Sequence, residues 1–133
     1  MINRITSDII TSLEPGQVFV FGSNTAGIHG GGAARTALQW GAVYGKGIGL
    51  HGMTYAIPTK NAQITHTLSL STIKSHVDTF LMFAWKRPDL TFLVTEIGCG
   101  LAGLQHADVA PMFKSAIHLE NVHLPQKFLD VIK

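Results

Sequence analysis

Cysteine, charged residues and long apolar runs are all scarce in this 133-residue sequence, and each scarcity excludes a class of protein. The single cysteine, Cys99, allows no internal disulfide, so the fold does not depend on an oxidising compartment. No apolar stretch approaches the roughly 18 residues that a membrane-spanning helix needs. The segment from Met1 to Asp8 lacks the basic and apolar regions of a signal peptide, so we expect a cytoplasmic protein without a membrane partner.

Charge is also low, at 14% Asp, Glu, Lys and Arg with a formal net charge of +2. This excludes nucleic-acid binding through charge alone, although a mildly positive surface suits a ligand that carries phosphate. The seven histidines form no H-E-x-x-H motif and no Cys/His spacing typical of a metal site. We therefore expect neither a metal ion nor a cofactor.

What the sequence does contain is a 46% share of hydrophobic residues, enough for the core of one domain over residues 1–133. Strands and helices alternate along it, which favours an α/β fold with a largely parallel sheet covered on both faces. We expect Pro58 to end the second strand and Asp108 to cap the third helix. The expected strands are 17–21, 54–57, 91–95 and 121–124, and the expected helices are 33–39, 71–86, one that follows Asp108 and one that opens at Pro125.

Two glycine-rich loops, 22–32 and 97–104, each follow an expected buried strand and precede a helix. In open α/β sheets, ligands bind beyond the carboxyl ends of the strands. Glycine lets a ligand approach the backbone, and successive N–H groups then form an anion site. The alternative is that the glycines only make turns, but two loops at equivalent strand ends favour a site. His29 and Cys99 lie inside these loops, where His29 could touch a ligand and N–H groups could lower the pKa of the Cys99 thiol.

Two other glycine segments match nucleotide motifs without their context. The segment 47–52 (GIGLHG) has the letters of a dinucleotide fingerprint, but it precedes a strand and opens no helix. The segment 41–46 (GAVYGK) is one residue too short for a P-loop and lacks the Ser or Thr that should follow the lysine. We interpret both as connections.

Three segments resemble corresponding segments of the macrodomain family. Their order and spacing also match, so the resemblance covers roughly residues 17 to 124. Residues 18–34 (VFVFGSNTAGIHGGGAA) resemble its first strand and ligand loop, and residues 97–109 (IGCGLAGLQHADV) resemble its second phosphate loop. The second loop is similar in form to the branch that holds the terminal ADP-ribose glycohydrolases and the DarG-type antitoxins. Residues 55–60 (YAIPTK) look like the strand that carries a functional lysine in that branch.

The resemblance implies a three-layer α/β/α sandwich with a mixed, mostly parallel sheet that binds ADP-ribose or a related nucleotide. It implies that Asn24 contacts the distal ribose and that Lys60 is the catalytic lysine. Asp8 is a candidate for binding the adenine amino group. The other ligand-binding candidates, some from the resemblance and some from their place in the loops, are His29, Gly30, Gly31, Gly32, Gly98, Cys99, Gly100, Leu101, Ala102 and Gly103.

The sequence departs from the family at the carboxylates. Ala102 occupies the position of the Asp that assists the lysine, and Ala33 follows the triple glycine where other hydrolytic members carry an Asp. Two functions therefore stay open. One is hydrolysis of ADP-ribosyl linkages through Lys60, on a protein, a nucleic acid or a small derivative. The other is a module without catalysis, either a reader of ADP-ribose or another nucleotide or an interaction module.

Overall fold

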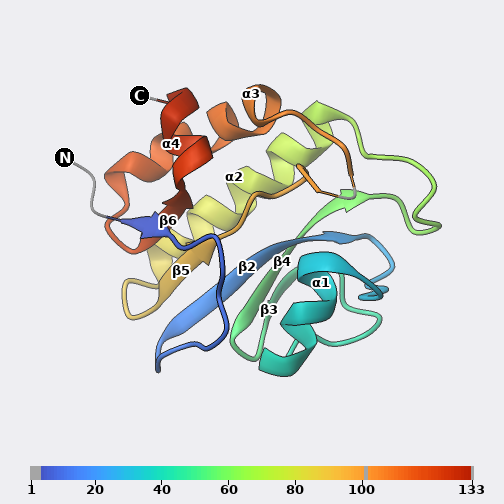
Figure 1. Ribbon diagram of the computed structural model, residues 1–133, viewed down its shortest axis with the longest axis horizontal. Coiled ribbons are helices and arrows are strands. Elements are labelled where there is room, and N and C mark those ends of the chain that lie inside the picture. The colour runs from blue at the N-terminus through green and yellow to red at the C-terminus, as the bar shows by residue number, and fades with distance from the viewer. Residues whose placement is uncertain (1–3, 101, 133) are drawn as a thin grey trace.

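Six strands form one mixed, mostly parallel sheet in an α/β fold, in the order β1-β6-β5-β2-β4-β3 (Figure 1). This computed structural model describes residues 4–100 and 102–132. Every neighbouring pair of strands is parallel except β3 and β4, which are antiparallel. The strands are β1 (Ile5–Thr6), β2 (Gln17–Asn24), β3 (Gly49–His51), β4 (Thr54–Lys60), β5 (Thr91–Val94) and β6 (Val122–Pro125).

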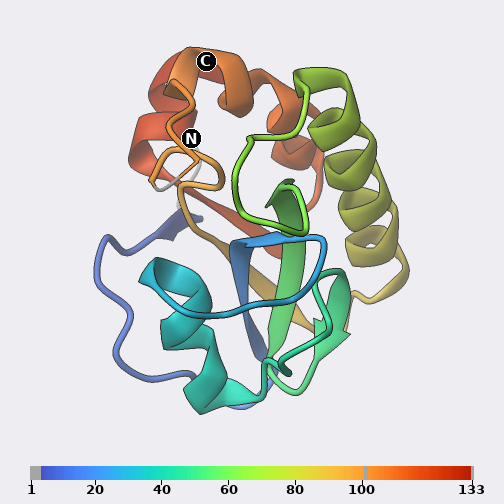
Figure 2. The ribbon, with the colours of Figure 1, turned by 90° about the vertical axis from the view of Figure 1, so that its right-hand side faces the viewer.

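Helices lie on both faces of this sheet (Figures 1 and 2). On one face α1 is followed directly by a short 3₁₀ segment, η1, and on the other α2 packs with the C-terminal helices. Among the described residues, no helix has both the length and the apolar character to cross a bilayer. The helical elements are α1 (Gly32–Ala37), η1 (Leu38–Trp40), α2 (Leu70–Lys86), α3 (His106–Val109), the 3₁₀ segment η2 (Ala110–His118) and α4 (Gln126–Ile132).

The central strand β2 separates two apolar cores because successive side chains point to opposite faces. Phe19 and Phe21 pack in the smaller core with α1. Val18 and Val20 lie in the larger core, which includes α2, η2 and α4. All four side chains are at most 4% exposed. Strand β2 is therefore buried on both faces, as its sequence predicted.

Helix α2 confirms the expected helix 71–86, and begins one residue earlier at Leu70. The Ser69 side chain caps it by accepting a hydrogen bond from the Thr72 N–H over 3.2 Å. The helix ends at Lys86, two residues before Pro88, as the restriction of residues before proline predicts. Gly41 ends η1 with a φ of 110°, in the left-handed region where glycine is favoured.

The prediction that Pro58 ends the second strand was wrong. Strand β4 continues to Lys60, with Pro58 opposite Ser23 of β2. The neighbour on the other side, β3, pairs only with residues 54–56, so no ladder partner there requires an N–H at position 58. This extension carries Lys60 to the edge of the sheet where the glycine loops lie.

The predicted cap at Asp108 was also wrong. Helix α3 begins at His106, and its N-cap residue is Gln105. The Asp108 N–H donates to the Gln105 carbonyl over 3.0 Å, so Asp108 already lies in the first turn. The helix then tightens into η2, which begins immediately before Pro111. The two short strands β1 and β3 were not predicted, and β3 lies within the segment 47–52 that we interpreted as a connection.

Candidate ligand-binding site

A cavity of about 630 Å³ opens beyond the carboxyl ends of β2, β4 and β5, and we call it the loop cavity. Both glycine-rich loops contribute to it, as the topology of parallel strands predicts. Of the ligand candidates from the sequence, it brings together Asn24, Lys60, the triple glycine, Gly98, Gly100 and Ala102. Its lining comprises residues 22–24, Ile28, residues 30–34, Thr59, Lys60, Ile64, Thr95, Glu96, Gly98, Gly100 and Ala102.

Asn24 holds the first loop in shape with its own side chain. Its Nδ2 donates to the Ile28 carbonyl over 2.8 Å, and its Oδ1 accepts from the Ile28 N–H over 2.9 Å. Gly27 closes the same turn through its N–H, which donates to the Asn24 carbonyl over 3.1 Å. The Asn24 amide is therefore part of the loop's internal framework, and its side chain is 6% exposed.

Two kinds of glycine occur in these loops. Gly27 is required by the fold, since its φ is 73° and a Cβ there would lie 2.3 Å from the Lys46 nitrogen. Gly30 and Gly100 differ, because neither has a positive φ and a Cβ on either would meet nothing within 4 Å. Both of these glycines line the cavity. Neither backbone strain nor packing explains them, whereas the close approach of a ligand would.

The second loop is closed by backbone hydrogen bonds. The Leu104 N–H donates to the Gly98 carbonyl over 2.8 Å, and the Gly103 N–H donates to the Gly100 carbonyl over 3.0 Å. The Thr67 hydroxyl donates to the Ala102 carbonyl over 2.7 Å and so ties this loop to the segment that follows β4. The predicted ligand residue Leu101 lies outside the described residues.

Of the lining residues that the structure describes, Lys60 at the end of β4 is the one cation. It stands opposite Asn24 in the sheet register, and its carbonyl accepts from the Thr25 N–H over 3.1 Å. Its side chain is partly buried. Among the described lining residues, the one carboxylate is Glu96, which accepts a hydrogen bond from His106 over 2.6 Å.

His29 does not line the cavity although it belongs to the first loop. Its ring is fully buried and meets Phe21 edge-on at 5.4 Å between centroids. Its Nε2–H donates to the carbonyls of Val43 and Lys46 at 3.0 and 3.2 Å, which assigns the proton to Nε2. His29 therefore supports the connection between η1 and β3.

Cys99 and Gly103 also lie outside the cavity lining. Burial is the largest cause that raises the pKa of the Cys99 thiol from 9.0 to about 11, and the carboxylates of Glu96 and Asp108 add to it. The effect is opposite to the lowering expected from nearby N–H groups. The thiol donates to the Ile97 carbonyl over 3.5 Å.

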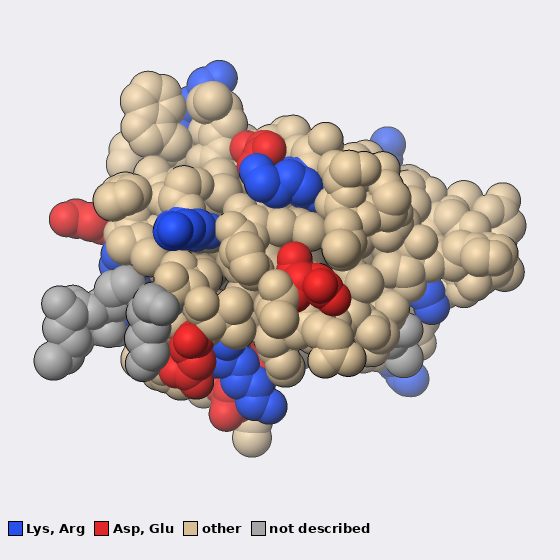
Figure 3. Space-filling view, turned by 90° about the horizontal axis from the view of Figure 1, so that it is seen from above, with Lys and Arg blue, Asp and Glu red and all other residues tan. Residues whose placement is uncertain are grey.

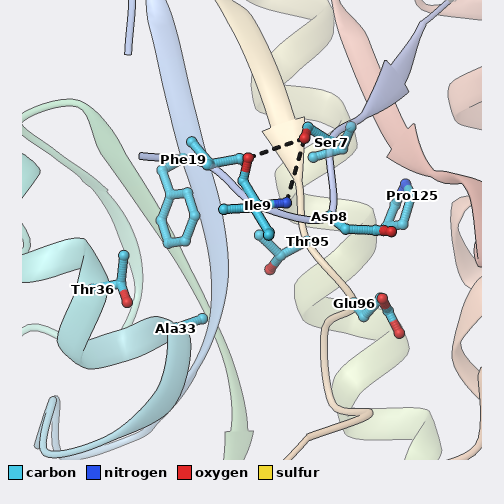
Figure 4. Close-up of a pocket in the computed structure, with 11 residues that line it drawn as sticks. Ser7, Asp8, Ile9, Phe19, Ala33, Thr36, Thr95, Glu96 and Pro125 are labelled. Atoms are coloured by element: carbon cyan, nitrogen blue, oxygen red, sulfur yellow. Dashed lines mark hydrogen bonds between the residues drawn. The ribbon is translucent and has the colours of Figure 1, made fainter. Parts of the chain in front are cut away.

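A second cavity of about 320 Å³, which we call the N-terminal cavity, adjoins the first (Figure 4). It shares Ala33, Thr95 and Glu96 with the loop cavity. The apolar residues Ile9 and Phe19 line it together with the acidic residue Asp8. It is lined by residues 6–10, Phe19, Ala33, Thr36, Thr95, Glu96 and Pro125.

Several lining residues were not predicted from the sequence. Thr95 and Glu96 follow β5 directly, so their place at a strand end was a signal for them. Ile28 and Ile64 gave no such signal, since apolar residues in loops have no preferred role. Ile64 has a φ of 59°, which is unusual for a β-branched residue and is found here at the cavity wall.

Charge on the face seen from above is divided into small groups of both signs (Figure 3). Among the described residues, no group of three or more His, Cys, Asp or Glu side chains could hold a metal ion. Comparisons with family models, with curated proteins and with solved structures found no match to this chain.

Proposed function

We propose that this chain is a macrodomain-like, three-layer α/β/α protein that binds ADP-ribose or a closely related nucleotide across the two cavities. The observation that carries the proposal is the pair Gly30 and Gly100, which line the loop cavity without a conformational or packing need for glycine. A diphosphate held by backbone N–H groups needs that freedom from side chains. The resemblance of both loops to macrodomain loops supports the same ligand.

The two cavities suit the two ends of such a ligand. The loop cavity, with its glycine loops and Lys60, would hold the diphosphate and the distal ribose. The N-terminal cavity, with Ile9, Phe19 and Asp8, has the apolar walls and the acceptor that a purine with an exocyclic amino group requires. Asp8 is then the residue that binds the adenine amino group.

Calorimetric titration with free ADP-ribose tests the proposal. We expect saturable binding by the wild type and none by Gly100→Glu, whose carboxylate would enter the cavity and repel the diphosphate. Ser75→Glu is the matched control, since it adds the same charge on the exposed side of α2. A wild type that does not bind at millimolar ADP-ribose would refute the assignment.

A second function, hydrolysis of ADP-ribosyl linkages, is favoured by the position of Lys60 in the loop cavity. A neutral amine could attack the anomeric carbon of the distal ribose while the bond to the modified group breaks, and the leaving group would take up a proton. Water would then release ADP-ribose and restore the amine. Ala102 and Ala33 supply no carboxylate to assist, so we expect such turnover to be slow.

The alternative is a reader that binds ADP-ribose on a macromolecule without cleaving it. Release of ADP-ribose from modified protein and modified DNA separates the two functions. Release by the wild type that is lost in Lys60→Ala would establish the hydrolase, and unchanged substrates with retained ADP-ribose binding would establish the reader. Both functions fit an intracellular protein, and we propose the cytoplasm as its location.

A further inference from the structure

Glu96 lies on the wall that the loop cavity and the N-terminal cavity share. It follows β5 by two residues, between the strand end and the second glycine loop. Its side chain is 34% exposed, so its carboxylate is within reach of a ligand that passes from one cavity to the other. A ligand with its base in one cavity and its diphosphate in the other must pass this residue.

The carboxylate of Glu96 is held from one side. The His106 ring, at the start of α3, donates from Nε2 to Glu96 Oε1 over 2.6 Å. His106 is itself placed against the Phe128 ring of α4, with 6.1 Å between centroids. No hydrogen bond from another described residue reaches Oε2. One carboxylate oxygen is therefore fixed, and the other retains its capacity to accept.

We propose that Glu96 accepts hydrogen bonds from the hydroxyls of the ribose that joins the base to the diphosphate, and thereby selects ligands with a free 2′-hydroxyl. This inference rests on the proposed binding of ADP-ribose, because the connectivity base, ribose, diphosphate places that ribose at the shared wall. An ionised carboxylate only accepts hydrogen bonds, and vicinal hydroxyls are suitable donors. A 2′-phosphate at the same place would offer no such donor and would be repelled.

Titration with two ligands tests this role. ADP-ribose and ADP-ribose 2′-phosphate share the base, the diphosphate and the distal ribose, so the glycine loops contribute equally to both. We expect the dissociation constant of the wild type for the 2′-phosphate to be at least about tenfold higher. A tenfold difference corresponds to the free energy of about one charge-assisted hydrogen bond. Glu96→Gln removes the charge with little change of shape, and we expect it to reduce that preference by about fivefold or more.

Glu120→Gln is the control, since it makes the same chemical change at an exposed residue in the turn before β6. Glu120 belongs to the lining of neither cavity. Thermal melting of each variant verifies that it is folded. An equal preference in the wild type and Glu96→Gln would overturn the role of Glu96 while leaving ADP-ribose binding intact. A wild type that binds neither ligand would overturn this inference together with the proposed function.

Discussion

The side chain of Asn24 forms a pair of hydrogen bonds with the backbone of Ile28, donating to its carbonyl over 2.8 Å and accepting from its N–H over 2.9 Å. Both halves of one amide thus brace the first glycine loop. A residue of this kind positions the loop's N–H groups before a ligand arrives. Under the proposed function, Asn24 would contribute to binding through the shape of the loop as well as through any contact of its own.

Replacement of Asn24 tests this bracing. Asn24→Ala removes both hydrogen bonds, and we expect a loss of roughly 1–3 kcal/mol in the free energy of unfolding together with loss of ADP-ribose binding. Denaturant unfolding and calorimetry measure the two effects. Asn61→Ala is a useful comparison, since Asn61 likewise accepts from the backbone N–H of Thr65, but that loop is exposed. Full stability in Asn24→Ala would contradict the bracing role.

The two kinds of glycine predict opposite outcomes for one substitution. Gly27→Ala places a Cβ 2.3 Å from the Lys46 nitrogen at a φ of 73°, and we expect it to cost roughly 1–3 kcal/mol of stability. Gly30→Ala meets no neighbour, so its stability should stay within about 0.5 kcal/mol of the wild type. We expect Gly30→Ala to weaken ADP-ribose binding nonetheless. Wild-type affinity in that variant would show that this glycine does not face the ligand.

Lys60 gives a prediction for catalysis. If the protein hydrolyses ADP-ribosyl linkages, Lys60→Ala should lower the rate of ADP-ribose release by about 10²- to 10⁴-fold. Lys60→Arg keeps the charge that attracts phosphate but removes the amine, so it should bind ADP-ribose and still fail to release it. Lys46→Ala, at an exposed lysine absent from the cavity lining, serves as the control. Wild-type turnover in Lys60→Arg would exclude the amine as the nucleophile.

We expect the ionisation of the Cys99 thiol to lower the free energy of unfolding at alkaline pH. Burial and two nearby carboxylates raise the thiol's pKa in the folded protein to about 11, above its ordinary 9.0. An acid whose pKa is raised by folding contributes its full stability below the ordinary value, and the contribution is lost as the pH rises toward the folded value. The free energy of unfolding should therefore fall between pH 9 and about 11. Cys99→Ala should remove that part of the pH dependence, and an identical profile in the variant would count against it.

The rate at which iodoacetamide alkylates Cys99 tests the raised pKa of this thiol more directly. Only the thiolate reacts, so alkylation of the folded protein should be slow at pH 8 and accelerate toward about pH 11. Rapid alkylation at pH 8 would mean that the loop stabilises the thiolate, as the sequence alone suggested. Mass spectrometry of the single cysteine follows this reaction without interference from another thiol.

Local patterns were sufficient to predict the long elements and the position of the loop cavity. The alternation of Phe19 and Phe21 with Val18 and Val20 predicted a strand buried on both faces, because side chains alternate along any strand. The helical repeat before Pro88 predicted α2 to within one residue. Glycine loops after two such strands predicted that both would meet at one edge of the sheet, which is where the loop cavity lies.

The tertiary structure alone decided what each residue of those loops does. The sequence determined that Gly27 and Gly30 share a loop. Only the packing of Lys46 against that loop makes glycine necessary at position 27, whereas a Cβ at position 30 would meet nothing within 4 Å. His29 is buried because its Nε2–H donates to the carbonyls of Val43 and Lys46, which lie on a different loop. Glu96 lies on the shared wall because β1 pairs with β6, and the segment after β1 lines the N-terminal cavity together with Glu96. Contacts between segments so far apart leave no period or spacing in the sequence, and so folding had to bring them together before these roles could be assigned.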